Sequence, residues 1–164
     1  MSTTLGDAFD AFGKDASRIE VLPAFNMPEE LEAFQASIAG QQPDLSFLSG
    51  WHDHLRGATQ AGKTHRRLRV VSDPPTDYEL FELKWGYPSN AVHGEQIRVT
   101  SRNDVRADLR DIWIFDGGDA AFEVLYDDSG SFLGSRELST DETREITSWF
   151  DATWSSAPDF SSLT

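Results

Sequence analysis

The sequence has 164 residues, no cysteine, 38% hydrophobic and 12% aromatic side chains, and a formal net charge of −14. This length suits one domain, residues 1–164, and the aromatic content excludes a disordered chain. Without cysteine there is no disulfide, thiolate zinc site or cysteine nucleophile, and no apolar run is long enough to span a membrane. The start shows no signal-peptide pattern, so we expect a cytoplasmic protein.

The charge is unevenly distributed along the chain. Residues 1–55 carry a net charge of −7, residues 56–110 a net charge of +3, and residues 111–164 a net charge of −10. Two acidic ends disfavour direct binding to nucleic acid, which depends on neutralising phosphates. They favour either a basic protein partner or a well-solvated surface.

The first half of the chain predicts mostly helices. Pro28 is placed to open one helix, and Gly40 is placed to end it. Leu31, Phe34 and Ile38 are expected to form the buried face of this helix. The other expected elements are a helix at 5–12, a strand at 18–22 and a helix at 47–61.

The second half predicts most of the strands. Thr76 is placed to cap a helix in which Tyr78 and Trp85 share a face. Gly86 and Pro88 are expected to break this helix. The expected strands are 65–72, 96–100, 111–115, 120–126 and 132–137.

A last helix completes the predicted fold. Ser139 and Glu142 match the S-x-x-E capping box that marks a helix start. The sequence as a whole predicts an α+β fold, with a mixed, mostly antiparallel sheet of about six strands flanked by about five helices. The expected buried stripe of the last helix is Ile146, Trp149, Phe150 and Trp154.

The segment 57–64 satisfies the Walker A pattern of nucleotide-binding loops. Such a loop must follow a strand and open a helix, so that the helix N-terminus faces the phosphates. Here the expected helix precedes the motif and the expected strand follows it. Gly62 is therefore interpreted as a helix C-terminal glycine and Lys63 as a cation favoured by the helix dipole. We expect no nucleotide hydrolysis.

Two other patterns resemble metal sites without meeting their geometry. His52 and His54 are two residues apart, so on a helix their imidazoles point in different directions and cannot share an ion. Asp127 and Asp128, close to Gly130, lack the spacing of a calcium loop and predict a polar hairpin turn. We therefore expect neither a metal ion nor a cofactor.

Basic residues are concentrated in the strand expected at 65–72. Arg67 and Arg69 share one face of this strand, opposite Leu68. One interpretation is an edge strand protected by its charge. The other is a site for an anion or an acidic partner, with Arg98 contributed by a neighbouring strand.

Aromatic and charged residues of the second half suggest a ligand pocket. An apolar pocket with a few polar groups is the usual form of a small-molecule site. Equally, aromatic side chains of this kind form hydrophobic cores, and the sequence leaves both interpretations open. The candidate pocket residues are Tyr78, Glu82, Trp85, Arg98 and Trp113.

Five short blocks in a fixed order carry a family resemblance. They are RVVSDP at 69–74, DY and FE within 77–82, GE and IR within 94–98, IWIFD at 112–116, and YDD, Gly130, Phe132 and Gly134 within 126–134. In this order they resemble an uncharacterised actinobacterial family, the domain-of-unknown-function family 6879. Its members are commonly encoded beside helix-turn-helix regulators, so the resemblance implies a role in transcription regulation.

From residue 65 to the last helix the chain also resembles the degenerate phospholipase-D-like effector domains that are attached to some regulators. Active members of that superfamily need a His-x-Lys pair, because the histidine attacks the phosphoryl group and the lysine holds its charge. This sequence has no His-x-Lys pair. The resemblance therefore implies binding without phosphodiesterase chemistry.

Together these observations predict a non-enzymatic accessory protein that binds a protein partner. The acidic ends suit a basic partner surface, and the family resemblance points to a helix-turn-helix, DNA-binding regulator. The alternative is a small-ligand sensor that uses the aromatic and arginine pocket. A third possibility is an enzyme of a class that the sequence does not reveal.

Overall fold

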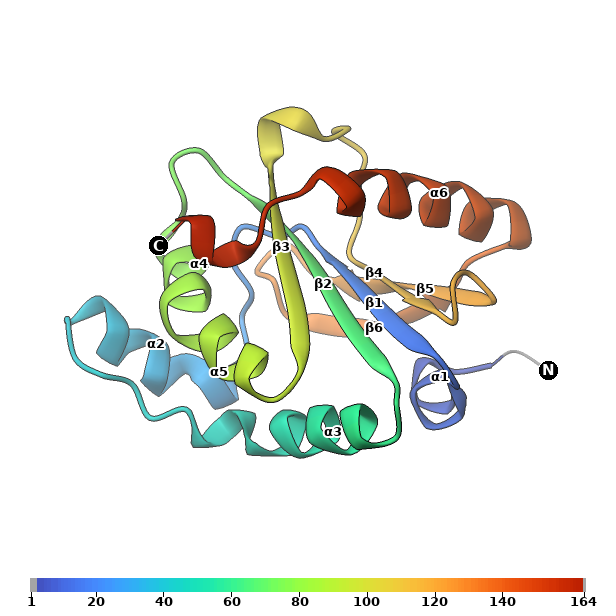
Figure 1. Cartoon of the computed structure of the whole chain (residues 1–164). Helices are drawn as coiled ribbons and strands as arrows, with labels where there is room; N and C mark the ends of the chain where they lie inside the picture. Colours follow the sequence, from blue (N-terminus) through green and yellow to red (C-terminus); the bar gives the residue numbers. More distant parts are fainter. Residues whose placement is uncertain (1–2, 164) are drawn as a thin grey trace.

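The computed structural model describes residues 3–163, which form one six-stranded sheet with helices on both faces (Figure 1). The strands are β1 (Asp15–Glu20), β2 (Thr64–Val71), β3 (Glu95–Ser101), β4 (Ile112–Phe115), β5 (Ala120–Tyr126) and β6 (Phe132–Glu137). Their order in the sheet is β3-β2-β1-β4-β5-β6. The pairs β1–β2 and β2–β3 are parallel, and the other three pairs are antiparallel. The predicted α+β fold, with a mixed and mostly antiparallel sheet, is confirmed.

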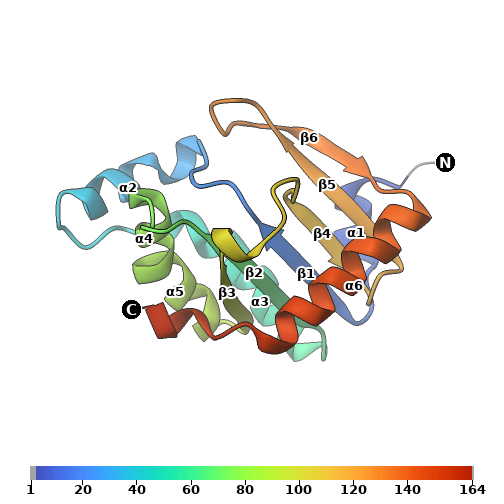
Figure 2. The ribbon, with the colours of Figure 1, turned by 90° about the horizontal axis from the view of Figure 1, so that it is seen from above.

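The helices divide between the two faces of the sheet. Figures 1 and 2 show α6 crossing one face, while α1, α3 and the α4–α5 segment lie on the other. The helix α2 packs on α4 and extends the second layer beyond β3. Among the described residues no helix is both long and apolar enough to cross a membrane. The helices are α1 (Leu5–Ala11), α2 (Leu31–Ile38), α3 (Ser49–Gln60), α4 (Asp77–Phe81), α5 (Tyr87–Val92) and α6 (Thr140–Ser156).

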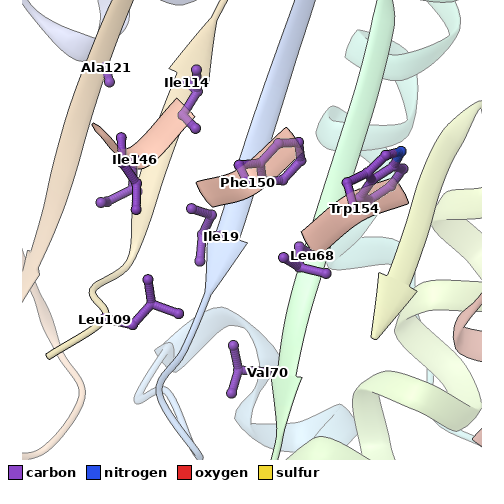
Figure 3. Packing of buried hydrophobic residues seen from close by; sticks show 10 residues of the cluster. Ile19, Leu68, Val70, Leu109, Ile114, Ala121, Ile146, Phe150 and Trp154 are labelled. Atoms are coloured by element: carbon purple, nitrogen blue, oxygen red, sulfur yellow. The ribbon is translucent and has the colours of Figure 1, made fainter. Parts of the chain in front are cut away.

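The largest hydrophobic core lies between α6 and the sheet. Ile146, Phe150 and Trp154 recur at helical spacing and point to the sheet across β4, β1 and β2, as Figure 3 shows. All three are buried, and Trp149 packs at the margin of the same cluster. This confirms the buried stripe predicted for the last helix.

Local signals for helix ends act as predicted. The Thr76 hydroxyl accepts a hydrogen bond from the Glu79 N–H at 3.1 Å, and the Glu79 carboxylate accepts one from the Thr76 N–H at 2.8 Å. Ser139 and Glu142 form the same reciprocal capping box at the start of α6. Gly62 follows α3 with φ +78° and precedes β2. The Walker-like segment therefore has a helix before it and a strand after it, as predicted, which is the reverse of a phosphate-binding loop.

The predicted break at Gly86 and Pro88 is wrong, because the helix continues through both residues. A π-helical turn, Glu82–Gly86, joins α4 to α5, and the Tyr87 N–H donates to the Glu82 carbonyl five residues earlier. Pro88, which has no N–H to donate, follows this wider turn directly and is tolerated near the start of α5. The extra residue of the turn also points both Glu82 and Tyr87 into the buried side.

The predicted buried face of α2 is also wrong. Leu31 and Ile38 are 51% and 58% exposed. Phe34 is the residue of that face that packs inward, against Tyr78 and Phe81 of α4. Because α2 contacts α4 and not the sheet, only a narrow stripe of this helix is covered.

The two polar turns of the last strands use aspartate side chains to hold the backbone. Asp116, at φ +51°, accepts hydrogen bonds from the backbone N–H groups of Gly13 and Lys14, which ties the β4–β5 turn to the start of β1. One Asp127 oxygen accepts from the N–H groups of Ser129 and Ser131 at 2.9 Å each. The segment after β5 is therefore a polar hairpin turn, as predicted.

Candidate ligand-binding site

The face of the sheet under α3–α5 is unusual because its centre is charged. The parallel register places Arg18 of β1 beside Arg67 of β2, and Glu20 beside Arg69. Arg18, Glu20 and Arg69 are all at most 5% exposed. Charged groups buried this deeply are stable only when they are paired, so their partners define the site.

Arg67 and Arg69 are paired with three acidic side chains, Glu20, Glu82 and Glu95. The Arg67 Nε donates to Glu95 Oε1 at 2.8 Å, and its Nη1 donates to Glu20. The Arg69 Nη2 and Nε both donate to Glu82 Oε1, at 2.7 and 3.0 Å. Glu82 reaches this position because the π-helical turn directs it toward the sheet. Each nitrogen of these two guanidinium groups has a partner within the protein.

The two carboxyls nearest Tyr87 differ in their affinity for protons. The Tyr87 hydroxyl lies 2.7 Å from Glu20 Oε1 and 3.1 Å from Glu82 Oε2. Burial raises the pKa of Glu82 well above its ordinary value, and the Glu20 charge adds to this effect. Burial also opposes ionisation of Glu20, but three guanidinium groups, led by that of Arg67, hold the pKa of Glu20 low. Glu82 is therefore the carboxyl that retains a proton.

Arg18 is the cation that the protein leaves incompletely paired. Its Nη2 donates to Asp111 Oδ1 at 3.2 Å and to the Tyr126 hydroxyl at 3.1 Å. Its guanidinium carbon lies 5.7 Å from the centre of the Trp113 ring. Its Nη1 is buried without a hydrogen-bond partner, one of three such side-chain atoms among the described residues. A charged donor that is buried without an acceptor costs free energy, so we expect a bound group to supply an acceptor for this nitrogen.

A cavity of about 390 Å³ lies against these residues. The sheet contributes Arg18, Glu20 and Arg67, and α3, α4 and α5 contribute the opposite wall. A cavity of this size, lined mainly by apolar and aromatic side chains with polar groups from both walls, has the form of a small-molecule site. Its aromatic lining residues are Phe25, Phe47, Trp51, Tyr78, Phe81, Tyr87, Trp113 and Tyr126.

A larger groove of about 720 Å³ lies where β2 and β3 end, beside the C-terminal end of α6. Its charged lining residues, Asp73 and Asp104, are both exposed. It has no buried charged group to fix a ligand. The smaller cavity is therefore the better candidate site.

Glu30 forms part of the cavity wall next to Tyr78. It is 8% exposed and accepts a hydrogen bond from the Tyr78 hydroxyl. Burial raises the pKa of Glu30 to about 7, and the negative charge of Glu20 contributes. The charge of the cavity wall consequently changes near neutral pH.

Three of the five predicted pocket residues lie together at the cavity. Tyr78, Glu82 and Trp113 line it, whereas Trp85 and Arg98 do not. Trp85 is half-buried and lies beside the Lys84 ammonium group, 5.3 Å from its nitrogen.

Arg98 is on the opposite face of the sheet. In the parallel register of β2 and β3 it pairs with Leu68, whose side chain faces α6. Its guanidinium lies 4.6 Å from the Trp154 ring and donates to the Trp154 carbonyl at 2.5 Å. Placing Arg98 beside Arg67 was therefore wrong.

Both sequence-based interpretations of Arg67 and Arg69 need correction. The strand β2 lies between β1 and β3, so it is not an edge strand. The two side chains are covered by helices and paired internally, and neither forms an exposed patch for an acidic partner. Their hydrogen bonds hold the side chains of Glu20 and Glu82 in position beside the cavity.

The histidines form two pairs that the sequence did not predict. His52 and His54 point in different directions, as expected, but His52 stacks on His93 with ring centres 4.1 Å apart. His54 Nε2 lies 2.9 Å from His65 Nε2, beside Trp51. Burial lowers the pKa of His65 to about 4. Within residues 3–163 no group of three or more His, Asp or Glu side chains is arranged to hold a metal ion.

Sequence reasoning missed the residues at the centre of the site. Arg18 and Glu20 alternate with Ser17 and Ile19 along β1, which is the pattern of a strand with one solvent-facing side. One sequence signal could have revealed the site: β2 repeats this alternation, with Arg67 and Arg69 as its charged residues. Two such strands side by side gather three arginines and Glu20, and they can be buried because Glu82, Glu95 and Asp111 supply the remaining acidic partners.

Comparison with known proteins places the fold and the family. Residues 3–163 match the family described as Domain of unknown function (DUF6879). No curated protein matches the chain in sequence. The structure is similar to that of Nuc, a phospholipase D family member from Salmonella typhimurium, with a TM-score of 0.54 over 93% of this chain and 85% of that chain. The two sequences are 10% identical, so the likeness shows a shared phospholipase-D-like fold.

Proposed function

The chain belongs to the DUF6879 family, and we propose that its function is to bind a small molecule in the aromatic cavity. The observation that carries this proposal is the buried Arg18 Nη1, a charged donor without a protein partner beside a cavity of about 390 Å³. A small molecule that fills the cavity and accepts a hydrogen bond from this nitrogen satisfies both features.

We propose binding and not catalysis. The phospholipase-D-like fold does not by itself bring an activity, because function depends on the site and not on the fold. The His-x-Lys pair of the active superfamily members is absent from the sequence. The carboxyls of the cavity are engaged in ion pairs and hydrogen bonds that support the site.

Two matched glycine substitutions test the proposal. Gly86 lines the cavity, has helical backbone angles, and would carry a Cβ with no atom within 4 Å. Gly86→Leu therefore fills part of the cavity without removing an interaction. Gly57, at an exposed position of α3, also has open space around its Cβ, so Gly57→Leu is the control.

The experiment is a thermal-shift screen of small molecules against wild type and both variants, with native mass spectrometry of freshly purified protein. We expect compounds that stabilise wild type and Gly57→Leu, and fail to stabilise Gly86→Leu. Stabilisation that is equal in all three proteins places the ligand elsewhere and contradicts the proposal.

A second candidate function is association with a basic protein partner. The outer face of α6 exposes Asp141, Glu142, Glu145 and Asp151, and residues 111–164 carry a net charge of −10. A surface of this sign suits the basic face of a DNA-binding protein and would compete with DNA for it. The family resemblance suggests a helix-turn-helix regulator as this partner.

Affinity capture from the native cytosol at low and moderate salt tests this second function. We expect a stoichiometric helix-turn-helix protein that is released as salt rises, because exposed charges are screened within about 10 Å at 0.1 M salt. With the purified pair, an association rate that is the same at low and high salt contradicts the electrostatic mechanism.

A further inference from the structure

We infer that the ligand of the aromatic cavity is a flat carboxylate, a planar ring system bearing one carboxylate group that accepts from Arg18 Nη1. This inference rests on the proposed function and specifies the class of small molecule. It depends on which donors and acceptors around the cavity the protein already satisfies.

The acceptors of the site have donors within the protein. Glu20 accepts from Arg67 and Tyr87, and Glu82 accepts from Arg69. Asp111 Oδ1 accepts from Arg18 Nη2 and from the Val21 N–H at 3.1 Å, and Glu30 accepts from Tyr78. A ligand that offers only donors, such as an amine, finds these carboxyl groups already occupied.

The unsatisfied group is a donor, and it carries charge. Arg18 is 4% exposed, and its Nη1 has no partner, whereas its Nη2 has two. Hydrogen bonds between ionised groups are roughly twice as strong as those between neutral groups. Because Arg18 is cationic, an ionised acceptor also gains Coulombic attraction that a neutral carbonyl lacks.

The number of available donors favours a carboxylate over a phosphate. Arg67 and Arg69 use their nitrogens on protein acceptors, so a single guanidinium nitrogen remains for the ligand. A phosphate dianion would bring more charge and more oxygens than one nitrogen can satisfy, close to the carboxylates of Glu20 and Asp111. A monoanionic carboxylate matches the one donor.

The aromatic lining of the cavity favours a planar body. Trp113 lies on the sheet beside Arg18, and Trp51 lies on α3 with its ring centre 6.0 Å from that of Trp113. Tyr126 and Phe25 continue the aromatic lining, with ring centres 5.0 Å apart. Rings prefer offset or edge-to-face contact with other rings, so a flat aromatic ligand gains contact on several sides.

Three probes of similar shape test the inference: indole-3-acetate, indole-3-acetamide and tryptamine. They carry the same ring with a carboxylate, a neutral amide and an ammonium group. Binding to the full chain is measured by calorimetry at neutral pH. We expect indole-3-acetate to bind at least about tenfold more tightly than the amide, because both accept from Arg18 but only the carboxylate adds attraction between opposite charges in the buried site. Tryptamine is expected to bind more weakly still.

Two arginine variants identify the donor. Arg18→Lys keeps a cation but loses the guanidinium fork, and we expect it to reduce the preference for the acid over the amide to below threefold. Arg66→Lys is the control, because Arg66 lies on the α6 face of the same sheet, 4.8 Å from the Phe150 ring. Circular dichroism before titration verifies that both variants are folded.

The outcomes separate this inference from the proposed function. If the amide binds as tightly as the acid, or tryptamine binds best, and Gly86→Leu abolishes binding, the carboxylate inference is overturned while the cavity remains the binding site. If none of the probes binds at millimolar concentration, the inference is also overturned, and the compound screen against Gly86→Leu decides the proposed function independently.

Discussion

Replacing Glu30 by glutamine should make the protein more stable, by an amount that grows as pH rises above about 4.5 and levels off above about 7. Glu30 is 8% exposed in the wall of the cavity, and burial raises its pKa to about 7 from an ordinary value of 4.5. Glutamine has nearly the same shape and keeps an oxygen that can accept from the Tyr78 hydroxyl. The substitution therefore removes the titration and preserves the contact.

The sign and size of the effect follow from proton binding. Between pH 4.5 and 7 the unfolded chain releases this proton while the folded chain retains it, so the free energy of unfolding falls as pH rises. Above pH 7 both states are ionised and the loss is complete. With about 1.4 kcal/mol for each unit of pKa difference, Glu30 costs about 3 kcal/mol at pH 8 and almost nothing at pH 4.

Urea unfolding of wild type and Glu30→Gln at pH 4 and pH 8 measures this difference. Relative to wild type, the variant should gain about 2–3 kcal/mol on going from pH 4 to pH 8. Glu29→Gln is the control, because Glu29 is the exposed neighbour in the same turn, and its effect should stay within about 0.5 kcal/mol at both pH values. An equal effect of Glu30→Gln at both pH values would contradict a raised pKa of Glu30 in the folded protein.

Three further predictions concern stability, and each is measured by urea unfolding. Arg69→Met should cost about 3–5 kcal/mol, because it removes a buried cation that lies 3.5 Å from the ionised Glu20 and donates to Glu82, and a cost below 1 kcal/mol would show that these interactions are dispensable. Gly130→Ala should cost about 1–3 kcal/mol, since Gly130 has φ +84° and an added Cβ would lie 2.9 Å from the Ala24 carbonyl oxygen; an unchanged midpoint would contradict that packing. Gly86→Ala should add about 0.5–1 kcal/mol, because Gly86 is helical with open space at its Cβ, and destabilisation would mean that the π-helical turn requires glycine.

Local features of the fold were predictable from the sequence because neighbouring residues determine them. The caps at Thr76 and Ser139 and the glycine end at Gly62 act within one turn of the chain. The ranges predicted for β5 and β6 agree with the structure for the same reason, since turn residues bound both strands.

The candidate site depends on pairings between distant strands, which local patterns do not specify. The alternation in β2 correctly placed Arg67 and Arg69 on one face, but nothing local showed that helices cover this face. The position of Arg98 depends on its parallel register with Leu68, which no turn links to β2. Arg18 was overlooked because a strand that alternates charged and apolar residues looks solvent-exposed, and its acidic partner Asp111 lies far away in the sequence.

The cavity wall also depends on a feature that sequence rules treat as a helix end. Gly86 and Pro88 usually mark the end of a helix. Here Gly86 ends a π-helical turn, Pro88 lies near the start of α5, and the helix continues through both residues. This turn brings Glu82 and Tyr87 to the same side as Glu20. The helix continues because its tertiary contacts with the sheet outweigh the low helix propensity of Gly86 and Pro88.

A crystal structure of the protein with the tightest compound from the thermal-shift screen shows directly whether the aromatic cavity is the binding site. We expect electron density for the compound in the aromatic cavity, beside Trp51 and Trp113, with an acceptor within hydrogen-bonding distance of Arg18 Nη1. Density in the larger groove beside Ser72 and Ser156, with the aromatic cavity unchanged, would contradict this expectation.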